Sequence, residues 1–141
     1  MRRQSLIPFG LLILLVVIPS CAPSAQQILA SSESQVKLRA IQTRAFDTPD
    51  KTKTLRTVIA TLQDLGFVVD KADENLGVVS GTKLAGYALR MTVTVRPYGE
   101  TKVHVRASAH FGLRVVEDPE PYQQFFDALS KAMFLTAQEV E

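Results

Sequence analysis

The chain has 141 residues, with 16 Lys or Arg, 14 Asp or Glu, two His and one Cys. Arg2 and Arg3 account for the whole formal charge of +2, so the rest of the chain is electrically balanced. That balance excludes a nucleic-acid-binding protein of high net positive charge. One cysteine excludes an intramolecular disulfide, and the length fits a single domain with a modest core.

The first 20 residues have the layout of an export signal. Arg2 and Arg3 precede an apolar stretch that runs from Leu6 to Ile18. A membrane-spanning helix needs about 20 consecutive apolar residues, and this stretch is shorter. We therefore expect a cleaved signal peptide over residues 1–20 and no lasting membrane span.

Cys21, the only cysteine, follows that signal directly. The tetrapeptide Ile18-Pro19-Ser20-Cys21 resembles the lipobox of bacterial lipoproteins, although proline stands where alanine or serine is usual. The resemblance implies lipidation of the Cys21 thiol, acylation of the new amino terminus with a chain such as palmitate, and a mature protein that begins at Cys21. Ala22 in place of aspartate resembles lipoproteins sent to the periplasmic face of the outer membrane. The alternative is a secretory signal cleaved near Ala22 or Ala25, with Cys21 incidental.

The next segment predicts a tether followed by the start of the domain. Residues 21–34 are mostly small and polar, which indicates a flexible tether. A single α+β domain is expected over residues 35–141. Its first element is predicted as a strand to about Phe46, because Val36, Leu38 and Ala40 alternate with polar residues.

A helix is predicted after Asp47, with Thr48 as its cap, Pro49 in its first turn and a stop at Gly66. Its apolar residues at helical spacing are Leu55, Val58, Ile59, Leu62 and Leu65.

Two antiparallel hairpins are predicted next. The first joins strands at 67–69 and 77–80 through a turn at 73–75, and the second joins longer strands through a turn at 97–100. The inward residues of the second hairpin are predicted as Tyr87, Leu89, Met91, Val93 and Val95, then Val103, Val105, Ala107, Ala109 and Phe111.

A last helix opens at Asp118-Pro119-Glu120-Pro121 and carries an apolar stripe of Tyr122, Phe125, Phe126, Leu129 and Met133. The predicted fold class is α+β: an antiparallel sheet of about five strands, with two helices packed on one face. The predicted order is strand, helix, four strands, helix.

No pattern of catalytic or metal-binding residues emerges, and we expect neither enzyme activity nor a cofactor. His104 and His110 lie six residues apart on one strand, about 20 Å, which is too far to share a metal ion. Ser80-Gly81-Thr82-Lys83 matches the S-x-x-K signature of serine acylases, but a strand points Ser80 and Lys83 to opposite faces. The acidic residues gather where turns and helix caps are predicted: Asp47, Asp50, Asp73, Glu74, Glu117, Asp118 and Glu120.

The outward side of the long hairpin is basic. No acidic residue occupies an outward position between Ala88 and Phe111. Such a face is a candidate docking site for an acidic protein surface or for anionic lipid or glycan, and the alternative is a solvated face. The candidate partner-binding residues are Arg90, Arg96, Lys102, His104, Arg106 and His110.

The order of these features resembles the domains of the BamC (NlpB) family, lipoproteins that are accessories of the outer-membrane β-barrel assembly machine. The resemblance covers about Val36 to Val140 and rests on the anchor, the helix end at Leu65-Gly66-Phe67 and the hairpin through Asn75-Leu76-Gly77-Val78-Val79. It implies a helix-grip fold, in which a sheet curls around a helix. This chain has one such domain where BamC has two, and a shared fold does not transfer the assembly role.

Two functions follow from these expectations. The first is a non-enzymatic accessory or scaffold in an envelope complex, anchored by lipid to the outer membrane. The second is a carrier of a small apolar or lipid ligand, held between the sheet and the C-terminal helix.

Overall fold

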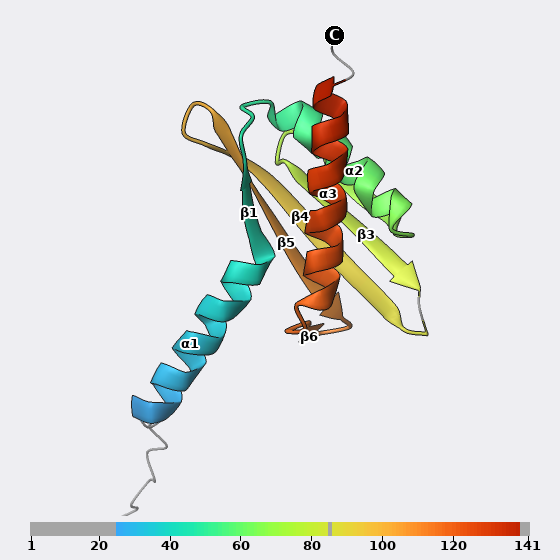
Figure 1. Ribbon diagram of the computed structural model, residues 1–141. Coiled ribbons are helices and arrows are strands. Elements are labelled where there is room, and N and C mark those ends of the chain that lie inside the picture. The colour runs from blue at the N-terminus through green and yellow to red at the C-terminus, as the bar shows by residue number, and fades with distance from the viewer. Residues whose placement is uncertain (1–24, 85, 139–141) are drawn as a thin grey trace, which may run out of the picture.

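The computed structural model describes the backbone of residues 25–84 and 86–138, and the side chains of residues 33–84 and 86–135. The protein has an α+β fold with an antiparallel sheet, so the predicted class is confirmed (Figure 1). It has three helices in the described part, so the predicted count of two is wrong. In chain order the elements are α1 (Ala25–Gln42), β1 (Thr43–Phe46), α2 (Lys51–Asp64), β2 (Val68–Asp73), β3 (Val78–Leu84), β4 (Ala88–Tyr98), β5 (Lys102–Phe111), β6 (Arg114–Val115) and α3 (Glu120–Gln138).

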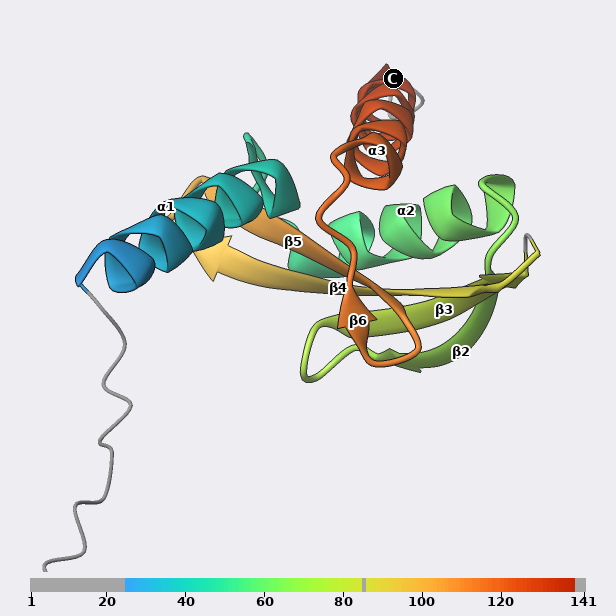
Figure 2. The ribbon, with the colours of Figure 1, turned by 90° about the horizontal axis from the view of Figure 1, so that it is seen from below.

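The strands are arranged in the order β1-β5-β4-β3-β2, and β6 pairs with β5 on the same edge as β1. Helix α2 packs on β2, β3 and β4, while α3 packs against α2 and β5. Figure 2 shows that α2 and α3 lie on one side of the sheet and that no helix of the described residues covers the other side. One sheet face therefore holds the core, and the opposite face is open.

The core lies between this sheet and the two covering helices. Strands β4 and β5 contribute alternate residues to it, as the alternation of the sequence predicts, and α3 contributes the predicted apolar stripe. Met133 of that stripe is only partly buried. The buried apolar residues are Leu55, Val58, Leu62, Phe67, Val79, Met91, Val93, Val95, Val103, Val105, Ala107, Ala109, Val116, Tyr122, Phe125, Phe126 and Leu129.

The N-terminal part of the domain differs from the prediction. Helix α1 replaces both the flexible tether from residue 25 onward and most of the strand expected up to Phe46, which is reduced to β1. Residues 25–42 contain neither glycine nor proline and include four Gln and three Ala, residues that favour helix. Val36 is exposed, whereas Leu38 and Ile41 are partly buried at helical spacing. The alternation at 36–40 was a coincidence over three apolar residues.

The helix predicted after Asp47 is confirmed as α2, but it starts two residues later than expected. Asp50 is the N-cap, because its Oδ1 accepts a hydrogen bond of 2.8 Å from the Lys53 backbone N–H. The Thr48 hydroxyl instead accepts from the Asp50 N–H at 3.3 Å. Gly66 ends the helix with φ at 83°, a conformation that glycine adopts without strain.

Both predicted hairpins are present. The turn between β2 and β3 needs Gly77, because a Cβ there would collide with the Val95 carbonyl oxygen and φ is 65°. Tyr87 was expected to face inward but is exposed, since β4 begins only at Ala88. Its ring instead lies against the edge of Phe111, with centroids 4.4 Å apart.

Tyr122 closes a gap in the outer edge of β5. Neither β1 nor β6 pairs with Ala109, which lies between them. The buried Tyr122 hydroxyl accepts a hydrogen bond of 3.2 Å from the Ala109 N–H and donates one of 2.7 Å to the Val116 carbonyl. The Gln42 side chain donates a third, at 3.4 Å. One hydroxyl on α3 thus connects the end of α1, strand β5 and the segment after β6.

Removing this hydroxyl is expected to destabilise the fold. Tyr122→Phe keeps the ring but leaves the Ala109 N–H and the Val116 carbonyl without their partner, which costs about 1–3 kcal/mol of unfolding free energy. Urea unfolding, monitored by circular dichroism, measures this change in the free energy of unfolding. Tyr98→Phe is the matched control, because Tyr98 is exposed and its substitution should change stability by less than about 0.5 kcal/mol. Equal effects of the two substitutions would show that the Tyr122 hydroxyl does not join these elements.

Candidate partner-binding face of the sheet

The open face of the sheet is built by the residues of β4 and β5 that alternate with the core. In the β4–β5 register, Arg90 lies opposite His110, Thr94 opposite Arg106, and Arg96 opposite His104. Strand β1 extends this face, because Thr43 lies opposite Arg106 on its other side. We call open face the set Thr43, Arg90, Thr92, Thr94, Arg96, His104, Arg106, Ser108 and His110.

A shallow hollow of about 530 Å³ lies in the middle of the open face. Its charged groups are Arg96 and Arg106, and His104 lies between them on β5. Its remaining lining is mostly hydroxyl groups, from Thr43, Thr92, Thr94 and Ser108, with Pro97 at one end. The guanidinium groups are donors, so the hollow suits a ligand that presents oxygen acceptors. The Thr94 and Ser108 hydroxyls donate at 3.5 Å to the carbonyls of Arg106 and Thr92.

Two residues of the hollow are held by neighbours from other elements. The Arg106 Nη2 donates a hydrogen bond of 3.3 Å to the Gln42 side-chain oxygen at the end of α1. The imidazole of His104 stacks on the ring of Tyr98, with centroids 3.8 Å apart and planes 15° apart. Arg96 has no carboxylate within 4 Å among the described residues. Among the described residues, the hollow thus has two guanidinium groups without a carboxylate partner and one imidazole stacked on a tyrosine ring.

Lys102 lies outside the hollow, at the β4–β5 turn. Its ammonium forms an ion pair of 2.9 Å with Asp47, which precedes α2. The hydrogen bond to this carboxylate, and then the attraction between the two charges, raise the pKa of Lys102 above its ordinary value. Both side chains are exposed, so the pair contributes little to stability, and it makes Lys102 less available to a partner.

Arg90 and His110 lie at the far end of the open face. The Arg90 Nε is 3.9 Å from Asp70, a carboxylate of β2 that also accepts a hydrogen bond of 2.7 Å from Thr82. A register shift in β2 between Val69 and Lys71 accompanies this placement of Asp70. The sequence interpretation was right that β4 and β5 bring no acid to this face. It missed the two acids that other segments bring, Asp47 and Asp70.

The six predicted residues are therefore not one cluster. Arg96, His104 and Arg106 meet at the hollow, whereas Lys102, Arg90 and His110 lie outside it. The hydroxyl residues of the hollow were missed as site residues. The alternation that predicted the basic residues also places Thr92, Thr94 and Ser108 on the same face, so the signal was present.

The other chemical motifs of the sequence keep structural roles. Ser80 faces the open side of β3 opposite Thr92, while the Lys83 ammonium lies 5.9 Å from the centre of the Phe67 ring. The acidic residues act at turns and caps: Asp73 accepts a hydrogen bond from the Leu76 N–H and Asp118 accepts one from the Glu120 N–H. Among the described residues, no three His, Cys, Asp or Glu side chains gather as metal ligands would. Cys21 and the signal over 1–20 lie outside the described residues.

No helix in the described part of the chain is long and apolar enough to cross a membrane. Comparison of the sequence with protein-family models and with curated proteins gives no match.

Proposed function

We propose that this protein is a non-enzymatic lipoprotein domain, held on the periplasmic face of the outer membrane through Cys21, that serves as an accessory or scaffold in an envelope complex. The observation that carries the docking role is the open face: a sheet surface with no helix over it, whose central hollow combines Arg96 and Arg106 with hydroxyl groups. The anchor rests on the likeness of Ile18-Pro19-Ser20-Cys21 to a lipobox.

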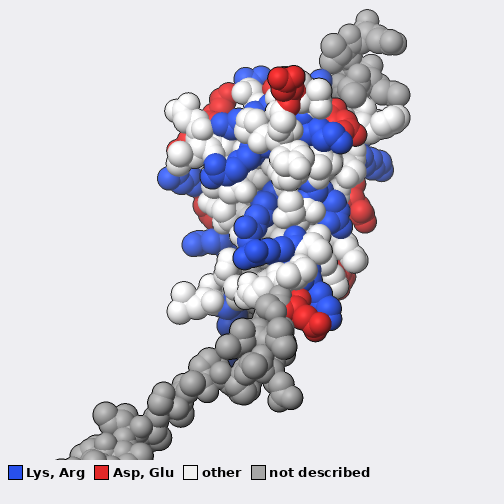
Figure 3. Space-filling model, turned by 90° about the vertical axis from the view of Figure 1, so that its left-hand side faces the viewer, with Lys and Arg blue, Asp and Glu red and all other residues white. Residues whose placement is uncertain are grey.

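The partner that this chemistry favours is an acidic protein surface. Arg96, His104 and Arg106 line one hollow from successive positions along β4 and β5, an arrangement that several carboxylates of a protein surface could meet. Figure 3 shows that Lys and Arg outnumber Asp and Glu on the flank of the molecule that carries α1 and β1, beside this face. Complementary charge would guide the partner to the face and fix its orientation there.

The proposed fold relation is to helix-grip domains such as those of BamC. It is supported by the position of α3, whose Tyr122, Phe125 and Leu129 are buried against the sheet. This relation bears on architecture and leaves the partner open.

The second candidate function, a carrier of an apolar ligand, has less support. The space between α3 and the sheet is filled by side chains with 0% exposure: Tyr122, Phe125 and Leu129. A hollow of about 380 Å³ does exist beside the first turn of α3, where Phe67, Leu89 and Phe111 line it together with the charged residues Lys83, Asp118 and Glu120. Lipid that stays bound in native mass spectrometry of the purified protein would favour this candidate.

Charge reversal on the open face tests the docking role. In the tagged protein at native level, Arg96→Glu with Arg106→Glu should reduce recovery of the partner at least about tenfold, since like charges facing each other across an interface cost several kcal/mol. Arg56→Glu on α2 is the matched control, because it reverses an exposed charge on the helical side. Unchanged recovery in the double variant, or a solitary monodisperse wild-type protein, would refute the proposal. Recovery of anionic lipid or glycan in place of protein would assign the face to that class of partner.

A further inference from the structure

Apolar side chains are exposed at two neighbouring turns of the sheet. Leu84 and Tyr87 flank the β3–β4 turn and are 82% and 63% exposed. Leu113 lies in the β5–β6 turn and Val115 in β6, and they are 101% and 45% exposed. Clustered exposed apolar residues mark a surface that contacts another apolar phase or molecule.

The strand register brings the two turns together at one end of the sheet. Leu84 pairs with Ala88 where β3 passes into β4, and Leu89 pairs with Phe111 where β5 ends. The contact between Tyr87 and Phe111 joins the two turns directly. We call this surface, formed by Leu84, Tyr87, Leu113 and Val115, the apolar end.

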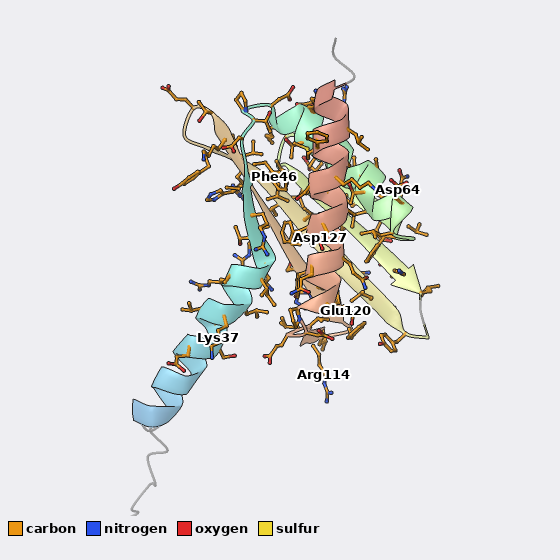
Figure 4. The ribbon with its side chains drawn as sticks, in the orientation of Figure 1. Lys37, Phe46, Asp64, Arg114, Glu120 and Asp127 are labelled. Atoms are coloured by element: carbon orange, nitrogen blue, oxygen red, sulfur yellow. The ribbon has the colours of Figure 1, made fainter. Side chains whose placement is uncertain are left out.

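Charges of both signs surround the apolar end. Cations lie near it on the strands and turns, one of them paired with an acid of β2, and further acids lie just before α3 and at its first residue. Figure 4 shows the Arg114 side chain pointing away from the body at this end, below the label of Glu120 at the start of α3. The cations are Lys83, Arg90 and Arg114, and the acids are Asp70, Glu117, Asp118 and Glu120. Such a surface suits a neutral apolar occupant better than a strongly charged one.

The proposed anchor suggests that occupant. Figure 1 shows that α1 runs away from the body on the side of β1, and that its start lies in the lower half of the view, as do β6 and, on the opposite side, the β3–β4 turn. Its first residue, Ala25, follows Cys21 by four positions. A lipid attached to Cys21 would hold the domain against a bilayer, and the apolar end is an exposed apolar surface that this bilayer could cover.

We infer that the apolar end rests on the phospholipid bilayer, with Leu84 and Leu113 inserted at its surface and Tyr87 at headgroup level. This inference rests on the proposed lipid anchor and is independent of docking at the open face. Tyrosine is enriched at membrane interfaces, and apolar groups that lie in an interface reach about 5–10 Å into it. The opposite end of the sheet, with the β2–β3 and β4–β5 turns, then faces away from the membrane.

Tryptophan reporters test this orientation, because the chain contains no tryptophan. Leu113→Trp places a reporter at the apolar end. Leu76→Trp is the matched control, since Leu76 is 62% exposed in the β2–β3 turn and β3 separates it from Leu84. Each full-length lipidated variant is reconstituted into phosphatidylethanolamine vesicles that contain brominated lipid, and tryptophan emission and sedimentation with the vesicles are measured.

The inference expects blue-shifted emission from Leu113→Trp and stronger quenching by lipids brominated near the headgroup than by lipids brominated at the chain ends. Leu76→Trp should remain unquenched. Sedimentation with the vesicles but no quenching of Leu113→Trp, or equal quenching of both reporters, overturns the inference and leaves the anchor standing. Failure to sediment overturns both.

Discussion

Phe125→Ala is expected to lower the free energy of unfolding by about 3–5 kcal/mol, the range for removing a buried aromatic ring. Phe125 lies on α3 with 0% exposure, and its ring meets the edge of Phe126 with centroids 5.1 Å apart. The loss combines the transfer free energy of the ring with the cavity that it leaves between α3 and the sheet. With no disulfide available within the chain, packing of this kind supplies most of the stability.

Chemical denaturation followed by circular dichroism measures the loss. Gln123→Ala, at an exposed position two residues earlier in the same helix, should change stability by less than about 0.5 kcal/mol. A loss near 1 kcal/mol or below for Phe125→Ala would contradict a filled core. It would also strengthen the case for a ligand carrier, because a ring that borders an empty pocket has fewer contacts to lose.

Cys21→Ala is expected to remove the protein from the outer-membrane fraction. If Cys21 carries the lipid, each buried acyl methylene contributes about 0.8 kcal/mol to membrane binding, and several chains make the attachment durable. Alanine has no thiol to lipidate, so incorporation of labelled palmitate should also fall to background. Cell fractionation with detection of the protein by antibody gives the distribution.

Ser20→Ala is the matched control for this substitution. It keeps a small residue beside an intact Cys21 and should leave both fractionation and palmitate incorporation unchanged. Outer-membrane fractionation of Cys21→Ala like that of the wild type would mean that the cysteine is incidental.

The long hairpin and the two covering helices were predictable because their periodicities extend over many residues. Along β4 and β5, apolar and polar residues alternate over about ten positions, because one face of the sheet is buried and the other faces solvent. Helices α2 and α3 carry apolar stripes over several turns. Gly66 marked the end of α2 and the Asp118-Pro119 segment marked the start of α3, because single glycine and proline residues are local signals of helix ends.

Helix α1 and strand β6 were missed because their local signals are weak. Val36, Leu38 and Ala40 fit a strand for only five residues, and in the helix that formed instead most of residues 33–42 are exposed. Strand β6 is two residues long and depends on its partner β5. Three threonines of α2 were missed as core residues because threonine is polar. They can be buried because each hydroxyl donates a hydrogen bond to a carbonyl one turn earlier: Thr54, Thr57 and Thr61.

The sequence could predict which face of the sheet carries the candidate site, but not which of its cations are paired. Alternation alone places Arg96, His104 and Arg106 on one face. Which cations are paired depends on contacts between segments distant in sequence, such as Lys102 with Asp47 and Arg106 with Gln42. These contacts exist only after the sheet has formed, and no local pattern encodes them.

The lipid on Cys21 is the claim on which the proposed location, the envelope partner and the orientation at the membrane all depend. Mass spectrometry of the N-terminal peptide of the mature protein, isolated from membranes, tests it most directly. We predict a peptide that begins at Cys21 and carries a diacylglycerol thioether and an acylated amino group. A peptide that begins after residue 21, or one in which Cys21 has a free thiol, would contradict the account.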